Sequence, residues 1–387
     1  MVVRSRSRRA AVATVGAVLV LTTGCSFGPP GPDQAGEPPN LSRPSAAPTS
    51  GQDSGDREAA LTVLAKDLEV PWGIAFLPDG SAVVTERDTA RVLKVGPESD
   101  AEGLKVSELD RLDEVRASGD GGLLGIAVSP DYDTDKTLYV YYSTDRDNRV
   151  GKLAGGKLQP ILTGIPRSPD QNGGALAFGP DGFLYVGTGD GTPTGTLAQN
   201  PKSLGGKILR ITTAGKPATG NPVKNSTVWS SGHRNVQGLA WDGDGRLFAT
   251  DTTQPLTSEL NVVAKGGNYG WPKADGDSTD TKLRNPMVFW PSTESACGGV
   301  AAVDSLVATT CLVGERLYLL SVTANGTVLG TPQELLSEEY GRLRALVAAP
   351  DGSLWLSTSN QEDGGEPGPE DDRLIRLVFS DGGAGRS

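Results

Sequence analysis

The sequence predicts an all-β protein, a six-bladed β-propeller, and three observations lead to this prediction. A short apolar run, a Pro-Asp-Gly turn or a close variant, and a second apolar run recur six times. The copies start about 45 to 65 residues apart, which is the size of a four-stranded blade with its loops. A ring of radial sheets buries the apolar face of each hairpin and leaves few sheet edges. The alternative is a β-sandwich, which the regular recurrence disfavours.

Each copy is predicted to form a β-hairpin. Proline presets φ for the first corner of a turn, and Asp-Gly tolerates a positive φ at the second corner. The runs on either side are apolar with a period of two, as half-buried strands are. The copies begin at Gly73, Gly125, Ala175, Gly238, Gly299 and Ala345, and the copy at Gly299 is the weakest.

Residues 1–24 are predicted to be a signal peptide. Four arginines, at positions 4, 6, 8 and 9, precede an apolar run at 10–21 that is too short to span a bilayer. The run ends in Leu-Thr-Thr-Gly-Cys, which resembles the lipobox of bacterial lipoproteins, although Thr22 stands where that pattern usually has Leu. The resemblance implies that Cys25 is acylated and anchors the exported protein to the outer face of the cell membrane; without acylation the protein is secreted. Sec and twin-arginine export both stay open.

The rest of the chain divides into a linker, one domain and a tail. Residues 25–57 are rich in Pro, Gly and Ser with almost no large apolar side chain, so we expect a disordered tether. Residues 58–380 suffice for one propeller with a sizeable core, and 381–387 are expected to be a disordered tail. Without the four leader arginines the formal net charge changes from −11 to −15. Such an acidic body is unsuited to nucleic acid, and solubility alone accounts for the charge.

Two further cysteines, Cys297 and Cys311, lie in the exported part. In an oxidising compartment we expect them to form a disulfide. Closing a loop of about 15 residues contributes about 3 kcal/mol in the chain-entropy account. The alternative is two reduced, buried thiols.

A census of reactive residues excludes several classes of enzyme. The chain has one histidine, His233, so HExxH and poly-histidine metal sites are excluded, and no GxSxG elbow accompanies this histidine. The Gly-rich segments at 119–125 and 187–192 lack the helix that a phosphate-binding loop requires. Polar clusters remain beside the repeated strands, where the loops of a propeller converge at one mouth of its channel.

These clusters, in the same order along the chain, resemble those of one known family. They include VPWGIAFLPDG at 70–80, GPDGFLYVGTGD at 179–190, SGHRNVQGLAW at 231–241 and ELNVVAKGGNYGWP at 259–272. The globular part thereby resembles the soluble quinoprotein glucose dehydrogenases, also called glucose/sorbosone or aldose sugar dehydrogenases. The resemblance implies a six-bladed propeller that binds pyrroloquinoline quinone (PQQ) and calcium at its mouth and oxidises the anomeric carbon of an aldose outside the cytoplasm.

The resemblance assigns cofactor contacts to five residues. Arg234, Asn235 and Gln237 match a stretch whose side chains contact the quinone in the family. The guanidinium of Arg234 suits a catalytic role as well, because it donates to quinone oxygens and stabilises an oxyanion. Arg342 and Arg344 match a pair that meets the cofactor carboxylates, and they are expected to alternate on one strand and face the same way.

The resemblance also indicates a calcium site in the loop at 251–255. The expected ligands are the backbone carbonyls of Thr253 and Gln254, which suit a hard cation, although the loop lacks the Gly-Pro of the family.

The chain departs from the family at two positions. Gln171 stands where the family has its catalytic His, and a carboxamide is no base near neutral pH. Because a general base contributes about 10²–10⁴ in rate, a substitute is needed for an efficient enzyme. Asp170 and Asp120 are candidates if burial raises a carboxyl pKa, although each also suits a structural role in a turn or bulge. Val313 stands where relatives carry a Lys, and this loss would weaken PQQ binding.

Three functions therefore stay open. The first is a PQQ-dependent sugar dehydrogenase with an altered base, favoured by the five cofactor residues. The second is a non-catalytic, lipid-anchored propeller that binds a sugar, a cell-wall fragment or a protein, favoured by Gln171 and Val313. The third is a propeller hydrolase or lactonase, disfavoured because no inward-facing set of Asp, Glu and Asn stands out. The sequence does not indicate the electron acceptor.

Overall fold

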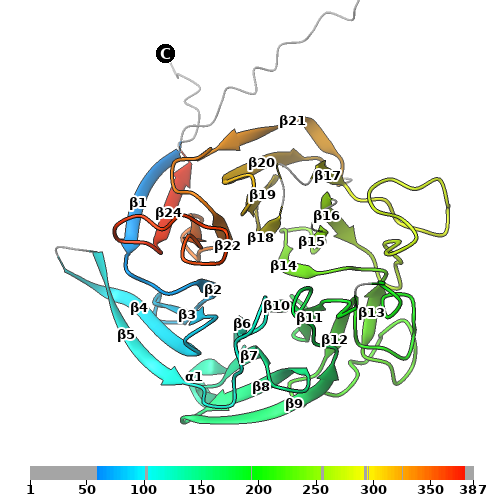
Figure 1. Ribbon diagram of the computed structural model, residues 1–387, viewed down its shortest axis with the longest axis horizontal. Coiled ribbons are helices and arrows are strands. Elements are labelled where there is room, and N and C mark those ends of the chain that lie inside the picture. The colour runs from blue at the N-terminus through cyan, green and yellow to red at the C-terminus, as the bar shows by residue number, and fades with distance from the viewer. Residues whose placement is uncertain are drawn as a thin grey trace, which may run out of the picture. The chain divides into compact units, whose positions relative to one another are not determined.

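The computed structural model describes residues 59–100, 103–192, 194–253, 257–291, 294, 296–324 and 326–379. Within these residues, 24 strands form six antiparallel sheets of four strands each. Figure 1 shows the sheets arranged radially around a central axis. The predicted six-bladed β-propeller is therefore confirmed. The predicted signal peptide, Cys25, the linker and the C-terminal tail lie outside the described residues.

Each blade runs from an inner strand at the axis to an outer strand at the rim. The first blade contains β2 (Pro71–Phe76), β3 (Ala82–Glu86), β4 (Arg91–Asp100) and β5 (Gly103–Arg111). The second contains β6 (Leu123–Val128), β7 (Leu138–Ser143), β8 (Asn148–Ala154) and β9 (Lys157–Ile165). The third contains β10 (Gly173–Phe178), β11 (Leu184–Thr188), β12 (Lys207–Ile211) and β13 (Val228–Ser231). The fourth contains β14 (Val236–Trp241), β15 (Leu247–Thr253), β16 (Thr257–Val263) and β17 (Val288–Pro291). The fifth contains β18 (Cys297–Val303), β19 (Leu306–Cys311), β20 (Arg316–Val322) and β21 (Val328–Leu335). The sixth contains β22 (Leu343–Ala348), β23 (Leu354–Thr358), β24 (Leu374–Phe379) and β1 (Ala59–Ala65).

The six repeated phrases are the inner hairpins of the six blades. Gly80, Gly182 and Gly352 end Pro-Asp-Gly turns with φ of 82°, 75° and 80°, the left-handed region that glycine adopts without strain. The second copy differs from the prediction, because the short helix α1 (Tyr132–Asp135) stands in place of a tight turn between β6 and β7. The extra residues of that connection, compared with the other copies, provide the length for a helical turn.

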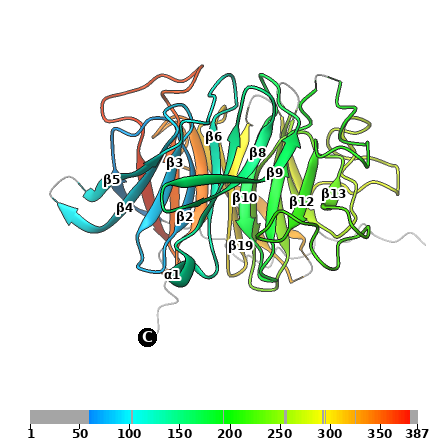
Figure 2. The ribbon, with the colours of Figure 1, turned by 90° about the horizontal axis from the view of Figure 1, so that it is seen from below.

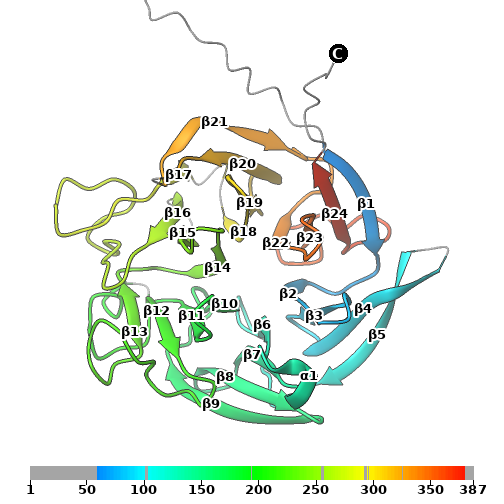
Figure 3. The ribbon, with the colours of Figure 1, turned by 180° about the vertical axis from the view of Figure 1, so that it is seen from behind.

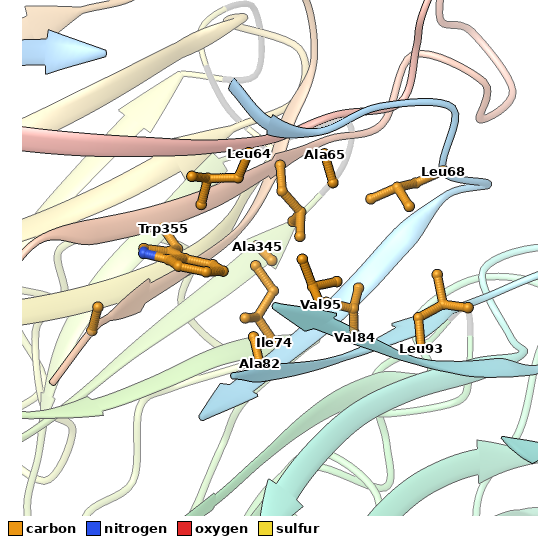
Figure 4. Close-up of a cluster of buried hydrophobic side chains, with 12 residues drawn as sticks. Leu64, Ala65, Leu68, Ile74, Ala82, Val84, Leu93, Val95, Ala345 and Trp355 are labelled. Atoms are coloured by element: carbon orange, nitrogen blue, oxygen red, sulfur yellow. The ribbon is translucent and has the colours of Figure 1, made fainter. Parts of the chain in front are cut away.

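The sixth blade closes the ring by pairing the two ends of the domain. β1 pairs antiparallel with β24, with Ala59 opposite Phe379. Figure 3 shows the blue first strand beside the red last strand. Leu64 of β1 and Trp355 of β23 then pack with Ile74 and Val84 of the first blade, as Figure 4 shows. Burying each such aliphatic side chain contributes about 1.5–3 kcal/mol, so the closure is stabilised by packing between blades as well as by strand pairing.

Cys297 and Cys311 form a disulfide, as predicted. They lie opposite one another on β18 and β19, and both are fully buried. The bond therefore joins the inner strand of the fifth blade to the strand next to it. In the part of the chain that the structure describes, no helix is long and apolar enough to cross a membrane.

The inner strands all begin at one face of the ring. The side view in Figure 2 shows the strands running between two faces, with α1 at the lower edge and the red loop between β23 and β24 at the upper edge. Because every blade has the same up-and-down order, the segments that enter the inner strands share the face opposite to the repeated turns. The cluster at 231–241 includes such a segment, before β14, whereas the clusters at 179–190 and 259–272 lie in or beside β11 and β16.

Candidate active site

A cavity of about 500 Å³ opens where the inner strands begin. This volume is typical of a site for a small molecule. Each inner strand contributes a lining residue from within three positions of its start. These residues are Trp72, Asp120, Gln171, Arg234, Ala296 and Arg342. The ends of the neighbouring strands and the loops after them add Arg87, Thr252, Leu312 and Glu362.

Eight residues of the predicted site line this cavity: the five expected to contact the cofactor, the two candidate bases, and Gln171, which stands where a base was expected. They are Asp120, Asp170, Gln171, Arg234, Asn235, Gln237, Arg342 and Arg344. Their roles stay predictions, but their proximity follows directly from the fold. The prediction that Arg342 lies on a strand with Arg344 is wrong, because β22 begins at Leu343. The Arg342 N–H donates to Asn360 Oδ1 at 2.8 Å, and its carbonyl accepts from the Ser359 N–H just after β23 at 2.8 Å.

Arg234 is held at the cavity by its backbone and by an aromatic ring. Its N–H donates to both oxygens of Asp251, at 3.1 and 3.0 Å. Its guanidinium carbon lies 4.6 Å from the ring centre of Trp271. The Nε and Nη1 atoms are buried and donate to no described residue. Burial lowers the pKa of Arg234, but a guanidinium remains charged at neutral pH.

Gln171 supports the same guanidinium. With its amide oriented to satisfy both ends, Gln171 accepts from Arg234 Nη2 at 3.1 Å and donates to the Thr192 carbonyl at 3.2 Å. Its φ is 64°, which Gln adopts less readily than Gly. Gln171 therefore orients Arg234 at the cavity.

The side-chain oxygens of Asn235 and Gln237 differ in their hydrogen bonding within the described residues. Asn235 Oδ1 accepts from the Gly173 N–H at 2.7 Å and so connects the third and fourth blades. Gln237 Oε1 is buried and accepts from no described residue. Of the two amides, Gln237 is the better placed to exchange hydrogen bonds with a ligand.

The other arginines of the cavity surround Glu362. Arg344 Nη2 and Arg87 Nη1 both donate to the Glu362 carboxylate. Arg342 Nη2 lies farther away, 3.9 Å from Glu362 Oε2. Burial alone raises the pKa of Glu362, but Arg344 and Arg87 outweigh burial and lower it to about 2. Glu362 is therefore ionised throughout the neutral range.

The two candidate bases lie in different environments. Asp120 is half-buried, and burial raises its pKa above the ordinary value of 3.8, while Arg344 acts in the opposite direction. Its backbone N–H donates to the Pro169 carbonyl at 2.7 Å, which fixes the loop. Asp170 is exposed. Of the two candidate bases, Asp120 is therefore the one whose carboxyl pKa is raised by burial, as predicted.

His233 is a structural residue. It is fully buried, and its ring contacts Ser230 Oγ at 2.8 Å and Asp251 Oδ2 at 3.2 Å. The ring also stacks on Tyr269 with centroids 4.7 Å apart. Asp251, which the sequence placed in a calcium loop, instead lies in β15 and accepts hydrogen bonds from this histidine and from the Arg234 backbone.

A known protein family matches the part of the chain that contains this cavity. The Glucose / Sorbosone dehydrogenase family model matches residues 68–366, which include every inner strand and the whole cavity. The chain belongs to the glucose/sorbosone dehydrogenase family. This confirms the family indicated by the sequence motifs.

Relatives within the glucose/sorbosone dehydrogenase family cover the chain to different extents. Quinoprotein glucose dehydrogenase B of Acinetobacter calcoaceticus is 31% identical over 266 residues, which cover 58% of this chain and 54% of the relative. Aldose sugar dehydrogenase YliI of Escherichia coli is 28% identical over 338 residues, or 76% of this chain and 89% of the relative. The chain spans just over half the length of the first two curated relatives that it matches, 57% and 54%.

A solved structure from this family is similar over the whole domain. The PQQ-bound form of aldose sugar dehydrogenase from Streptomyces coelicolor is 41% identical, with a TM-score of 0.78. The match covers 84% of this chain and 99% of that one.

The cavity fits the cofactor of that relative. PQQ is a flat quinone with three carboxylates, so it needs N–H donors at its rim. Arg234 Nε and Nη1 and Arg342 Nε are buried donors without a partner among the described residues, and both side chains line the cavity. Leaving such donors unpaired costs about 1–3 kcal/mol each, which a ligand with acceptor oxygens would recover.

Two predictions that depend on the family pattern remain without a test. Thr253 ends β15, and Gln254 lies outside the described residues, so the calcium site stays a prediction. No group of three or more His, Cys, Asp or Glu side chains suited to a metal occurs within the described residues. Val313 lies in the turn between β19 and β20 and is 40% exposed, while its neighbour Leu312 lines the cavity.

Four further residues of the site were not predicted from the sequence. Glu362 and Arg87 lie in the cavity wall, and Trp271 lies against Arg234. Trp72 lines both this cavity and a second one of about 410 Å³ between the inner strands. The sequence position of Trp72 could have indicated its role. Trp72 directly precedes the first repeated phrase, and polar residues of the site precede other copies at the same place.

Proposed function

We propose that the chain is a PQQ-dependent sugar dehydrogenase that oxidises the anomeric carbon of an aldose. The observation that carries the proposal is that N–H groups of Arg234 and Arg342 have no partner among the described residues and lie in the same cavity as the half-buried Asp120. The quinoprotein and aldose sugar dehydrogenase names of its relatives support the same activity. We further propose that the protein acts outside the cytoplasm and is anchored through Cys25.

Each residue of the cavity has a task in this proposal. When bound, PQQ supplies the two-electron acceptor for the hydride that leaves the anomeric carbon. Arg342, Arg344 and Gln237 hold the cofactor at its rim. Arg234 directs fixed N–H donors at the region where negative charge develops, which stabilises that charge without reorganisation.

Asp120 takes the proton from the anomeric hydroxyl in the proposed reaction. Burial raises its pKa, which increases the basicity of the ionised form that accepts the proton. Asp170 lies on the same cavity but is exposed, so it lacks this environment. Gln171 orients Arg234 and takes no proton.

The second candidate function is a propeller that binds a sugar or another ligand without chemistry. The Gln at position 171 and the exposed Val313 favour it, because both depart from the family pattern. Adding PQQ, calcium and an aldose to the purified chain separates the two. The dehydrogenase proposal predicts that the bound quinone becomes reduced by the aldose, whereas a bound quinone that no aldose reduces supports the binding protein.

A further inference from the structure

Glu362 lies in the middle of an arginine cluster drawn from two blades. Arg87 follows β3 in the first blade, whereas Arg342 directly precedes β22 in the sixth blade and Arg344 lies in it. Glu362 itself lies in the loop between β23 and β24. Its side chain is 9% exposed, so the cluster is largely removed from water.

Glu362 accepts hydrogen bonds from two of the three arginines and forms only a longer ion pair, at 3.9 Å, with the third, Arg342. Arg344 and Arg87 donate to opposite oxygens of Glu362. Arg87 also donates to Asp88 at 2.7 Å, and Arg344 Nε contacts Ser359 Oγ at 3.3 Å. The Arg342 side chain makes no hydrogen bond within the described residues, and its Nε atom is buried.

The contact of Glu362 with Arg344 is the contact that a ligand carboxylate would make. Carboxylates and guanidinium groups pair through charge-assisted hydrogen bonds, which are about twice as strong as neutral ones. All three arginines and Glu362 line the same cavity. A polycarboxylate entering this cavity therefore meets Arg342, which contacts Glu362 only at 3.9 Å, and two arginines that already donate to a carboxylate.

We propose that Glu362 is a built-in competitor for anionic ligands of this cavity. Its carboxylate occupies Arg344 in place of a ligand carboxylate and weakens the binding of any polycarboxylate. The inference rests on the proposed function only for the identification of PQQ as the natural ligand. Because Glu362 is ionised across the neutral range, the competition does not depend on pH there.

Equilibrium binding to the Glu362→Gln variant tests the proposal. The probe is benzene-1,2,4-tricarboxylate, which carries three carboxylates and undergoes no redox chemistry under these conditions. Removing a charge next to Arg344 should tighten its binding to the full chain about tenfold by isothermal titration, because nearby charges interact strongly in a partly buried site. Unchanged or weaker binding by a folded variant would overturn the proposal, since Glu362 would then only orient the arginines.

Asp363→Asn is the matched control. Asp363 lines the same cavity and carries the same charge, but it is exposed and forms no ion pair with an arginine in the described residues. Its substitution should change the affinity by less than about twofold, as expected for an exposed charge in salt. Equal tightening by both variants would also overturn the proposal, because net charge alone would then explain the effect.

A second variant covers the case in which Glu362→Gln does not fold. Glu362→Asp keeps the charge but withdraws it from Arg344, so it should tighten binding by a smaller factor; no tightening counts against the competition. PQQ itself is titrated in parallel. If PQQ binds to none of these proteins, the proposed function fails, and the tricarboxylate result still decides the inference about Glu362.

Discussion

Replacing Asp120 by Asn tests the proposed base. The substitution keeps the size of the side chain, and the hydrogen bond from its backbone N–H to the Pro169 carbonyl is unaffected. It removes the group that we expect to accept the hydroxyl proton. A positioned general base is worth about 10²–10⁴ in rate, so kcat with an aldose should fall by that factor in the PQQ-loaded protein.

The pH profile gives a second readout for the same residue. Burial raises the pKa of Asp120 above 3.8 and Arg344 opposes this effect. Because the base works in its ionised form, kcat/KM should rise with pH through that raised pKa and then level off. The acidic limb should move to lower pH in Glu362→Gln, since the loss of this negative charge leaves Arg344 and Arg87 free to favour ionised Asp120.

The assay follows aldose-dependent reduction of a dye by the loaded enzyme, with Asp170→Asn as the control. Asp170 borders the same cavity but is exposed, so its substitution should change kcat by less than about tenfold, which is well below the contribution of a general base. Full activity in Asp120→Asn together with a large loss in Asp170→Asn would refute the assignment and move the base to Asp170.

Three other predictions follow from the site and its surroundings. Gln171→His should restore about 10² of the rate lost in Asp120→Asn by supplying another base, and an unchanged double variant would argue against a base site at position 171. Arg234→Ala should lower kcat by about 10²–10³ through the loss of charge stabilisation, and a change confined to KM would contradict this. The pKa of Glu362 is lowered from 4.5 to about 2, so its ionised form should stabilise the fold by about 3 kcal/mol above pH 4.5, and this stabilisation should disappear as the pH falls to 2. Urea unfolding of the native chain and of Glu362→Gln at pH 6 and pH 3 measures the difference. An identical pH dependence of the free energy of unfolding in the two proteins would count against it.

The inner hairpins were predictable because their signal is local. Proline and glycine fix a turn within four residues, and the strands on either side share one period, so Gly73 and Ala345 mark hairpins without knowledge of the rest of the chain. The closure by β1 and β24 has no such signal, because it pairs residues about three hundred positions apart. The helix α1 was missed although it is local, because the connection between β6 and β7 was interpreted as a tight turn like those of the other copies, whereas it is longer.

The residues of the site were predictable where they stand in a sequence motif. They were not predictable where their role depends on contacts with residues distant in the sequence. Arg234 and Asn235 stand in a motif, and the family resemblance pointed to both. Glu362 lies in an acidic loop like many others, and its importance arises from Arg87, which is 275 residues away in the sequence. The predicted alternation of Arg342 and Arg344 on one strand failed by one residue, because β22 begins at Leu343 and the Arg342 N–H donates to the Asn360 side chain.

The central claim is that the mouth cavity binds PQQ and passes electrons from an aldose to it. The most direct measurement is a titration of the purified chain with PQQ in the presence of calcium, followed by absorbance, and then the addition of an aldose. The account predicts saturable binding at micromolar PQQ and a change of the quinone spectrum to the reduced form on adding sugar, with this reduction slowed about 10²–10³-fold in Arg234→Ala. The absence of any PQQ binding under these conditions would contradict the claim and favour the sugar- or cell-wall-binding propeller.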